Sequence, residues 1–371
     1  MTAGAGAYGG DGRGGPAARP PQSFDDALAV LAGLPGGFPA HAGRAAGLYR
    51  RLARLLHPDT AQAGRAAEAT AAFAALADAW RARSVTAADG GPDGLAPMDG
   101  LAPMDGRLHR YTPGPVIATG DLAELRSAHY EDAGARRPAV LKVPLLPRDN
   151  DLMEHEADVL DRLDRVAEPR HRAYAPVLLE SFRHATADGA ERRVNVLAPL
   201  SGFHTLAEVA AAHPGGLDPR DAAWMWRRLL TGLGWAHRAG LVHGAVFPEH
   251  VLIHPRLHGL VIADWCYATA VGTDVPVLVT RHRDAYPPEV REHLPASPAT
   301  DIHLASVCVR DLMGSQAPPE MRAFLRGCTL PSQRSRPQDA WRLLAELDDL
   351  LTRLYGPRTF RPFAMPEPSR P

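Results

Sequence analysis

The chain has 371 residues, 45% of them apolar, so it is long enough to bury a sizeable core in two or three domains. Its 41 basic and 42 acidic residues create no net field that would hold nucleic acid or an anionic membrane, and neither partner is expected. Three scattered cysteines exclude a disulfide framework, and no apolar run reaches the roughly 20 residues that span a bilayer. We therefore expect a soluble, cytoplasmic protein.

The first part of the chain is typical of a disordered tail followed by a short helical unit. Residues 1–22 are rich in Gly, Ala and Pro and too poor in large apolar groups to offset the entropy of ordering. Within residues 23–84, Ser23 and Asp26 form a weak capping signal for a first helix. Two further helices carry apolar stripes, made of Leu48, Leu52, Leu55 and Leu56 and of Phe73, Leu76, Ala77 and Trp80. The two stripes predict an antiparallel hairpin.

The loop at the tip of this hairpin is His57-Pro58-Asp59. Three arginines on the helix before it are expected to face solvent: Arg50, Arg51 and Arg54. The arrangement resembles the J domain of DnaJ-type co-chaperones. The resemblance implies that the loop and the arginine face dock a DnaK-type chaperone and stimulate its ATPase. The alternative is a helical hairpin whose His-Pro-Asp turn has no such role.

After the hairpin the residue pattern of the sequence changes at two points. The hexapeptide GLAPMD occurs twice in tandem, and from about residue 110 short runs typical of strands precede longer helical patterns. The expected parts are a linker at 85–109, a sheet-rich lobe at 110–200, a helical lobe at 201–355 and a proline-rich tail at 356–371. In the tail, Phe360 and Phe363 either pack back on the helical lobe or serve as a docking segment. The fold class expected is α+β, with a small all-α unit before a two-lobed domain.

One basic position differs from all the others in its residue type. Every basic residue is an arginine except Lys142, which is the single lysine of the chain. If usage alone set the choice, a basic position would hold lysine about one time in 41, so this site favours a compact ammonium over a guanidinium. A chance surface lysine is the alternative.

The segments around Lys142 resemble, in order, those of the eukaryotic-type protein kinase fold over residues 110–355. They read ATGDLAEL, AVLKV, HEADVLDRL, LAPLSGFHTLAEV, LLTGLGWAHRAGLVHG, VIADW, YPPEV, DIHLAS and RPQDAWRLL. The resemblance implies a nucleotide site with a glycine-loop residue, a lysine–glutamate pair and a magnesium carboxylate: Gly120, Lys142, Glu156 and Asp264. It also implies that Glu289 pairs with Arg336.

The stretch LVHGAVFPEHVLI, residues 241–253, departs from that family at the positions that carry the chemistry. Ala245 stands where an aspartate accepts the substrate proton, and loss of such a base removes a factor of about 10² to 10⁴ in rate. His250 stands where an asparagine would bind a second magnesium ion, for which an imidazole is a poor ligand. Asp121 and Glu124 add negative charge to the degenerate glycine loop. No catalytic residue is therefore expected.

Two functions follow from these observations. The first is a non-enzymatic J-domain protein fused to a pseudokinase, which stimulates a DnaK-type ATPase and recruits an unidentified protein client. The second is an atypical Ser/Thr kinase that uses Glu249 or His250 as its base. Both functions are compatible with weak binding of ATP or ADP together with magnesium. Asp264 is the residue expected to bind the magnesium ion. The alternative to nucleotide binding is a purely structural pair of Lys142 and Glu156.

Overall fold

The computed structural model divides the chain into two compact units, Met1–Gly100 and Leu101–Pro371. It describes residues 21, 23–33, 102–185 and 189–366, and the single residues 52, 55, 56, 65, 68, 69, 71, 72, 75 and 76. None of the helices in these parts of the chain is long and apolar enough to cross a membrane.

The described residues of the first unit form a small helical core. Helix α1 (Phe24–Ala32) begins with a capping box in which the Ser23 hydroxyl accepts from the Asp26 N–H, as the sequence indicated. The buried cluster consists of Ala27, Leu52, Leu56, Ala72 and Leu76. The loop His57-Pro58-Asp59 and the three arginines Arg50, Arg51 and Arg54 lie outside the described residues. The J-domain assignment therefore stays a prediction.

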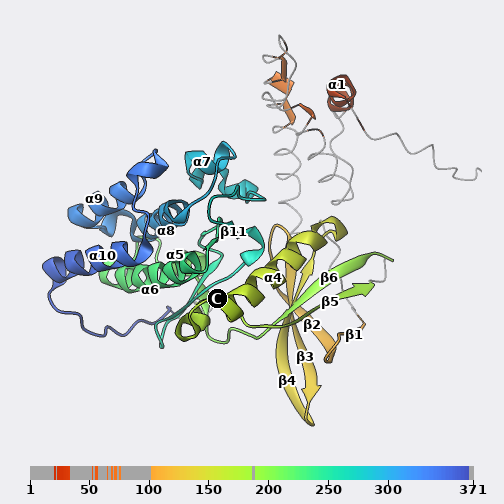
Figure 1. Cartoon of the computed structure of the whole chain (residues 1–371), viewed down its shortest axis with the longest axis horizontal. Helices are drawn as coiled ribbons and strands as arrows, with labels where there is room; N and C mark the ends of the chain where they lie inside the picture. Colours follow the sequence, from red (N-terminus) through yellow and green to blue (C-terminus); the bar gives the residue numbers. More distant parts are fainter. Residues whose placement is uncertain are drawn as a thin grey trace, which may run out of the picture. The chain divides into compact units, whose positions relative to one another are not determined.

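A six-stranded antiparallel sheet opens the second unit, in the order β1-β2-β3-β4-β6-β5 (Figure 1). The strands are β1 (Met104–Asp105), β2 (Arg110–Thr119), β3 (Ala123–Asp132), β4 (Ala135–Pro144), β5 (Leu178–Ala185) and β6 (Glu191–Leu197). Strand β1 lies within the range 85–109 that was expected to be linker. Ala133 and Gly134 join β3 to β4 with φ values of 49° and 77°, which a two-residue hairpin turn of the primed type requires.

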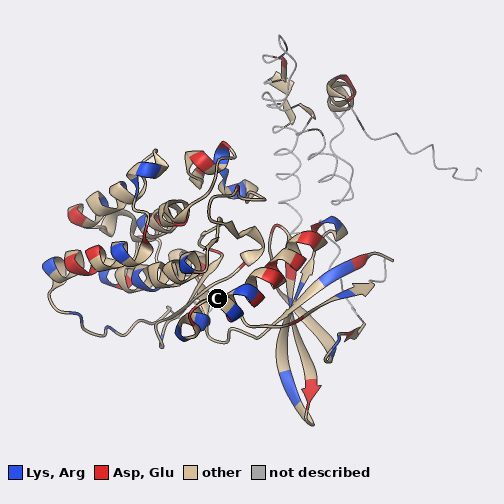
Figure 2. Ribbon diagram, in the orientation of Figure 1, with Lys and Arg blue, Asp and Glu red and all other residues tan. Residues whose placement is uncertain are grey.

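Helix α4 (Asn150–Val166) packs against β6 and β5 with one face. Its buried positions are Met153, Glu156, Ala157, Val159, Leu160 and Leu163, which recur at helical spacing. Most of the other positions of the helix hold charged residues, which are Asp151, Glu154, Asp158, Asp161, Arg162, Asp164 and Arg165 (Figure 2). Glu156 is the exception on the buried face, where it pairs with Lys142.

The remainder of the second unit is mainly helical. Its helices are α5 (Leu206–Ala212), α6 (Pro219–Arg238), α7 (Pro288–Arg291), α8 (Pro298–Met313), α9 (Pro319–Cys328) and α10 (Ala340–Tyr355). Short 3-10 helices are η2 (Pro147–Asp149), η3 (Pro169–Tyr174), η4 (Trp265–Tyr267), η5 (Thr280–Ala285), η6 (Gly314–Gln316) and η7 (Gln333–Ser335). Short strands form two small sheets, of β7 (His204–Thr205), β9 (Val251–His254) and β10 (Gly259–Ile262), and of β8 (Leu241–Val242) and β11 (Thr269–Ala270). The expected α+β class is confirmed.

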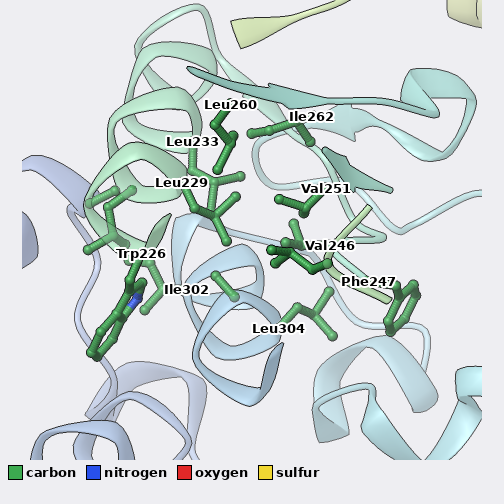
Figure 3. Packing of buried hydrophobic residues seen from close by; sticks show 14 of the residues in the cluster. Trp226, Leu229, Leu233, Val246, Phe247, Val251, Leu260, Ile262, Ile302 and Leu304 are labelled. Atoms are coloured by element: carbon green, nitrogen blue, oxygen red, sulfur yellow. The ribbon is translucent and has the colours of Figure 1, made fainter. Parts of the chain in front are cut away.

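Helix α6 lies at the centre of the large core. Trp226, Leu229 and Leu233 project from it towards β9, β10 and α8 (Figure 3). They meet Val251 and Ile302, among other apolar side chains that exclude water from this region. The core thereby supports the chain segment 243–250, which runs between α6 and β9.

A buried ion pair fixes the segment around α7. Arg336 donates to a Glu289 carboxylate oxygen at 2.5 Å, and the Thr300 hydroxyl donates to the other oxygen at 3.0 Å. Both charged side chains are almost fully buried. Because two ions taken out of water depend on each other, the pair holds α7 to the segment before α10.

The substitution Arg336→Ala is expected to destabilise the second unit by about 3–5 kcal/mol, because it leaves the buried Glu289 carboxylate without its counter-ion. The measurement is thermal unfolding followed by tryptophan fluorescence. The matched control is Arg334→Ala, two residues away and exposed, which should leave the melting temperature unchanged. Equal effects of the two substitutions would contradict a structural role for the pair.

Candidate functional site

Three segments that are far apart in sequence meet at Lys142. This residue lies on β4 and is 3% exposed. Its Nζ is 2.7 Å from Glu156 Oε1 on α4 and 2.5 Å from Asp264 Oδ1, just after β10. Cys266 Sγ is a further 3.9 Å neighbour of the same nitrogen. The single lysine is therefore a buried ammonium and not a chance surface residue.

The second oxygen of Glu156 is held by Asn195, a residue that the sequence did not single out. Asn195 is the cross-strand partner of Lys142 on β6. Its Nδ2 donates to Glu156 Oε2 at 3.0 Å and to the Met153 carbonyl at 2.9 Å, while its Oδ1 accepts from the Ser181 hydroxyl at 2.7 Å. The amide thus orients the carboxylate towards the ammonium.

The charges in this cluster keep each other ionised. Burial alone would lower the pKa of Lys142, but the charges of Asp264 and Glu156 raise it, and the net shift is well upward. Burial raises the pKa of Asp264, and Lys142 and His250 lower it by more, so the net shift is downward. The Cys266 thiol has a raised pKa because it is buried. At neutral pH the cluster holds one ammonium, ionised Asp264 and a protonated thiol.

Three side chains of this cluster lie close enough together to bind a metal ion. Glu156, Asp264 and Cys266 offer ligand atoms that all lie within 4.8 Å of one another. Lys142 Nζ contacts all three of these groups, so the ammonium already supplies the positive charge that they surround. Asp264, the residue expected to bind magnesium, is therefore engaged with Lys142 in this conformation.

Asp264 reaches Lys142 from an unusual backbone conformation. Its φ and ψ are 61° and 50°, in the left-handed region that aspartate tolerates better than most residues. Behind it, the Trp265 indole N–H donates to the Ile262 carbonyl at 2.7 Å and its ring packs edge-on against His243 at 4.7 Å. The large buried ring fixes the turn that carries the carboxylate.

Asp301, at the start of α8, organises the segment 243–250. Its Oδ2 accepts from the His243 N–H at 2.8 Å and its Oδ1 accepts from the Gly244 N–H at 2.9 Å. Gly244 has a φ of 74°, and a Cβ there would lie 3.1 Å from the Tyr267 carbonyl oxygen. A glycine is thus favoured at this position by its own backbone conformation and by the nearby carbonyl.

The two degenerate positions lie side by side in this segment. Ala245 is completely buried. His250 Nδ1 donates to the Ala245 carbonyl at 2.8 Å, and His250 Nε2 lies 3.4 Å from Asp264 Oδ2. The imidazole also stacks on the Tyr267 ring, with centroids 5.5 Å apart. His250 is therefore a second neighbour of Asp264, and its Nδ1 is occupied.

Glu249, the other candidate for a substitute base, is paired with the segment η5. Its carboxylate is 3.0 Å from His282 Nε2 and 3.5 Å from Arg281 Nε. Burial raises the pKa of Glu249, but a backbone hydrogen bond, His282 and Arg281 lower it, and the net shift is downward. A carboxylate whose pKa is lowered is a weaker base, so these contacts disfavour proton abstraction by Glu249.

The degenerate glycine loop lies between β2 and β3. The Gly120 N–H donates to the Ala123 carbonyl at 2.9 Å. Asp121 accepts from Arg281 at 3.1 Å, and the buried Glu124 pairs with Arg126. The two carboxylates that were expected to repel phosphate are therefore both compensated by arginines.

Comparisons with known proteins agree with a kinase-like region. No protein-family model matches the chain. The serine/threonine-protein kinase PknL of Mycobacterium tuberculosis is 32% identical over 108 residues, which is 28% of this chain and 27% of that protein. The protein of the same name from Mycobacterium bovis gives the same values. The chain thus spans about a quarter of the length of these curated relatives. It contains a kinase-like region.

The buried His243 predicts a pH dependence of stability. Its Nε2 donates to the Ala263 carbonyl at 2.8 Å and its Nδ1 accepts from the Ala245 N–H at 3.3 Å, so the neutral ring has no place for a second proton. Burial lowers its pKa from 6.5 to about 4. The unfolded chain takes up this proton at higher pH than the folded chain does. The free energy of unfolding should therefore fall by roughly 3 kcal/mol between pH 6.5 and 4.

The measurement is urea unfolding of the wild type and of His243→Gln at several pH values. In the variant, the free energy of unfolding should no longer show this decrease between pH 6.5 and 4. His184→Gln, on the edge strand β5, is the matched control and should keep it. Parallel curves for the wild type and His243→Gln would contradict the assignment.

Proposed function

We propose that the second unit is a pseudokinase: a kinase-like domain that binds a protein partner and does not transfer phosphate. The observation that carries this proposal is the buried Ala245 at the position of the catalytic base. An alanine side chain has no atom that accepts a proton. The acids around it have other partners, since Asp264 pairs with Lys142, Glu249 with His282, and Asp301 with backbone N–H groups.

One observation favours the competing function, an atypical Ser/Thr kinase. The pair of Lys142 and Glu156 at 2.7 Å is the arrangement from which a lysine can contact nucleotide phosphates. Phosphoryl transfer depends largely on positioning and charge stabilisation, so loss of the base lowers the rate without abolishing it by itself. The activity of the purified protein distinguishes the two functions.

The residues present fit a nucleotide only in part. Lys142 could hold phosphate oxygens, and Asp264 could hold one magnesium ion once its contact with Lys142 is exchanged. The site does not fit a second magnesium ion, because the position offers an imidazole whose Nδ1 already bonds to a carbonyl. We propose weak binding of ATP or ADP with one magnesium ion.

We further propose that the first unit is a J domain that stimulates a DnaK-type chaperone. Support comes from the sequence order of the arginine helix, the His-Pro-Asp loop and the third helix, and from the small apolar core of the described residues. The linker before β1 would keep a client bound by the pseudokinase at a high effective concentration near the chaperone. The client is an unidentified protein.

The purified protein is expected to show no incorporation of radiolabelled phosphate, into itself or an added protein, that depends on Lys142 or Asp264. The physical reason is the lack of a proton acceptor at residue 245. The assay compares the wild type with Lys142→Met and Asp264→Asn. The asparagine variant is nearly isosteric and removes one carboxylate charge from the cluster.

Incorporation that is clear in the wild type and lost in both folded variants would support the atypical kinase and overturn the pseudokinase. Circular dichroism checks folding, because Lys142→Met leaves two carboxylates without their ammonium. Melting curves with ATP and magnesium report nucleotide binding independently of transfer. A shift in the wild type that is lost in Asp264→Asn would assign the ion to this carboxylate.

The full-length protein is expected to stimulate the steady-state ATPase of a DnaK-type chaperone, and His57→Gln should abolish the stimulation. A proline-stiffened loop loses little entropy on docking, so its contacts contribute strongly to binding. The control is His41→Gln, at the predicted start of the arginine helix and away from the loop. Stimulation that survives His57→Gln would remove the co-chaperone function and leave the pseudokinase proposal intact.

A further inference from the structure

A cavity away from the Lys142 cluster is lined almost entirely by basic and aromatic groups. It has a volume of about 150 Å³ and lies between α6, α10, the turn before β10 and the C-terminal segment. We call it the arginine cavity, and its lining residues are Trp224, Arg227, Arg228, Thr231, His258, Leu344 and Arg358. At about 30 Å³ for each water molecule, it has room for one tetrahedral oxyanion.

The charges that line the arginine cavity are not balanced. Arg227 pairs with Asp348, which lines the neighbouring groove, and Arg228 donates to the His258 carbonyl at 3.0 Å. Arg358 has no ion-pair or hydrogen-bond partner within residues 102–185 and 189–366. The guanidinium groups of Arg227, Arg228 and Arg358 are therefore balanced by a single carboxylate at the cavity, that of Asp348.

The protonation of the neighbouring groups reflects this excess of positive charge. Burial, followed by the charges of Arg228 and Arg358, lowers the pKa of His258. Burial also lowers the pKa of Arg227; Asp348 opposes this, while Arg358 and Arg228 add to it. Like charges that depress each other in this way are stabilised by a bound anion.

Two buried ring nitrogens at the cavity also lack partners. Trp224 and His258 are 9% and 8% exposed, and their rings stack with centroids 4.1 Å apart. Trp224 Nε1 and His258 Nε2 are buried and form no hydrogen bond with any described residue. An unpaired buried polar atom costs free energy, so a ligand with acceptor oxygens in the cavity would compensate the Trp224 N–H.

The C-terminal segment closes one side and is firmly attached. Arg361 pairs with Asp218 at 3.0 Å and with Asp221 at 2.9 Å, at the start of α6. Phe363 is buried against Trp224, with ring centroids 6.0 Å apart. The segment turns back from α10 (Figure 1) and brings Arg358 to the cavity.

A larger groove of about 610 Å³ adjoins the arginine cavity and shares four lining residues with it. Its wall includes Leu351, Tyr355 and Phe360, and Phe360 lies over the His258 ring at 4.6 Å while it is 70% exposed. Ligand sites of several hundred Å³ usually combine an apolar wall with a few polar groups that fix orientation.

We propose that the arginine cavity binds the phosphate group of a small phosphate monoester, whose organic part lies in the adjoining groove. Arginine matches phosphate because its planar fork donates two parallel hydrogen bonds to two oxygens. Arg227, Arg228 and Arg358 supply the positive charge, Trp224 supplies an unpaired N–H donor, and Phe360 covers the organic group. This site is separate from the one at Lys142 and does not depend on its function.

The test is calorimetric titration of the full-length protein with sodium phosphate at neutral pH and constant ionic strength. Saturable binding is expected, and Arg358→Gln should weaken it by about tenfold or more. Arg353→Gln, an exposed arginine on α10 that does not line the cavity, is the matched control and should stay within about twofold. Absence of binding in the wild type, or equal weakening by both substitutions, would overturn the proposal.

Two further measurements separate the proposal from a structural role of these residues. Without phosphate, Arg358→Gln should keep or raise the melting temperature, because it relieves repulsion from Arg227 and Arg228. A lower melting temperature would show that the chain itself compensates this charge, and would overturn the proposal. Phenyl phosphate should bind several-fold more tightly than inorganic phosphate, and Phe360→Ala should remove the difference. Equal affinities in the wild type would overturn the assignment of the groove.

Discussion

The second unit depends on the burial of one ammonium group among its acceptors. Lys142 Nζ carries three N–H donors, and it finds one acceptor each on α4, at the end of β10 and on Cys266. Each of these ions alone would be costly to remove from water, and together they compensate each other. The sheet, α4 and the turn after β10 are therefore held in one arrangement. This geometry also explains why a lysine persists in a chain that otherwise uses arginine.

The shape of the segment 243–250 depends on contacts of its backbone with Asp301. Asp301 holds the backbone of His243 and Gly244, and neither contact involves the side chain at position 245. Under the proposed function, a domain of this kind can lose its base and keep its surface. The buried pair of Glu289 and Arg336 stabilises the neighbouring segment in the same way. The conformation of the segment 243–250 is thus independent of the side chain at position 245.

The sequence identified the residues of the central cluster because the lone lysine and the two acids stand in segments with a recognisable order. Asn195 was not found, since its importance comes from lying opposite Lys142 on β6, and strand register cannot be read from composition. The expectation that Asp121 and Glu124 would repel phosphate left out their arginine partners. Arg281 is remote from Asp121 in the sequence, and the pairing of Arg126 with Glu124 depends on the geometry of β3. The arginine cavity escaped prediction for a similar reason: its basic groups belong to three distant segments.

Arg281 adds an exposed electrostatic link between two parts of the chain whose neighbouring apolar residues already belong to one buried cluster. It contacts Asp121 in the loop after β2 and Glu249 in the segment before β9, and all three side chains are about a third or more exposed. Pairs of this kind contribute about 0–1 kcal/mol each and weaken as salt is added. The contact between the loop after β2 and η5 therefore weakens as salt is added, whereas the buried ion pair of Lys142 and Glu156 is screened much less.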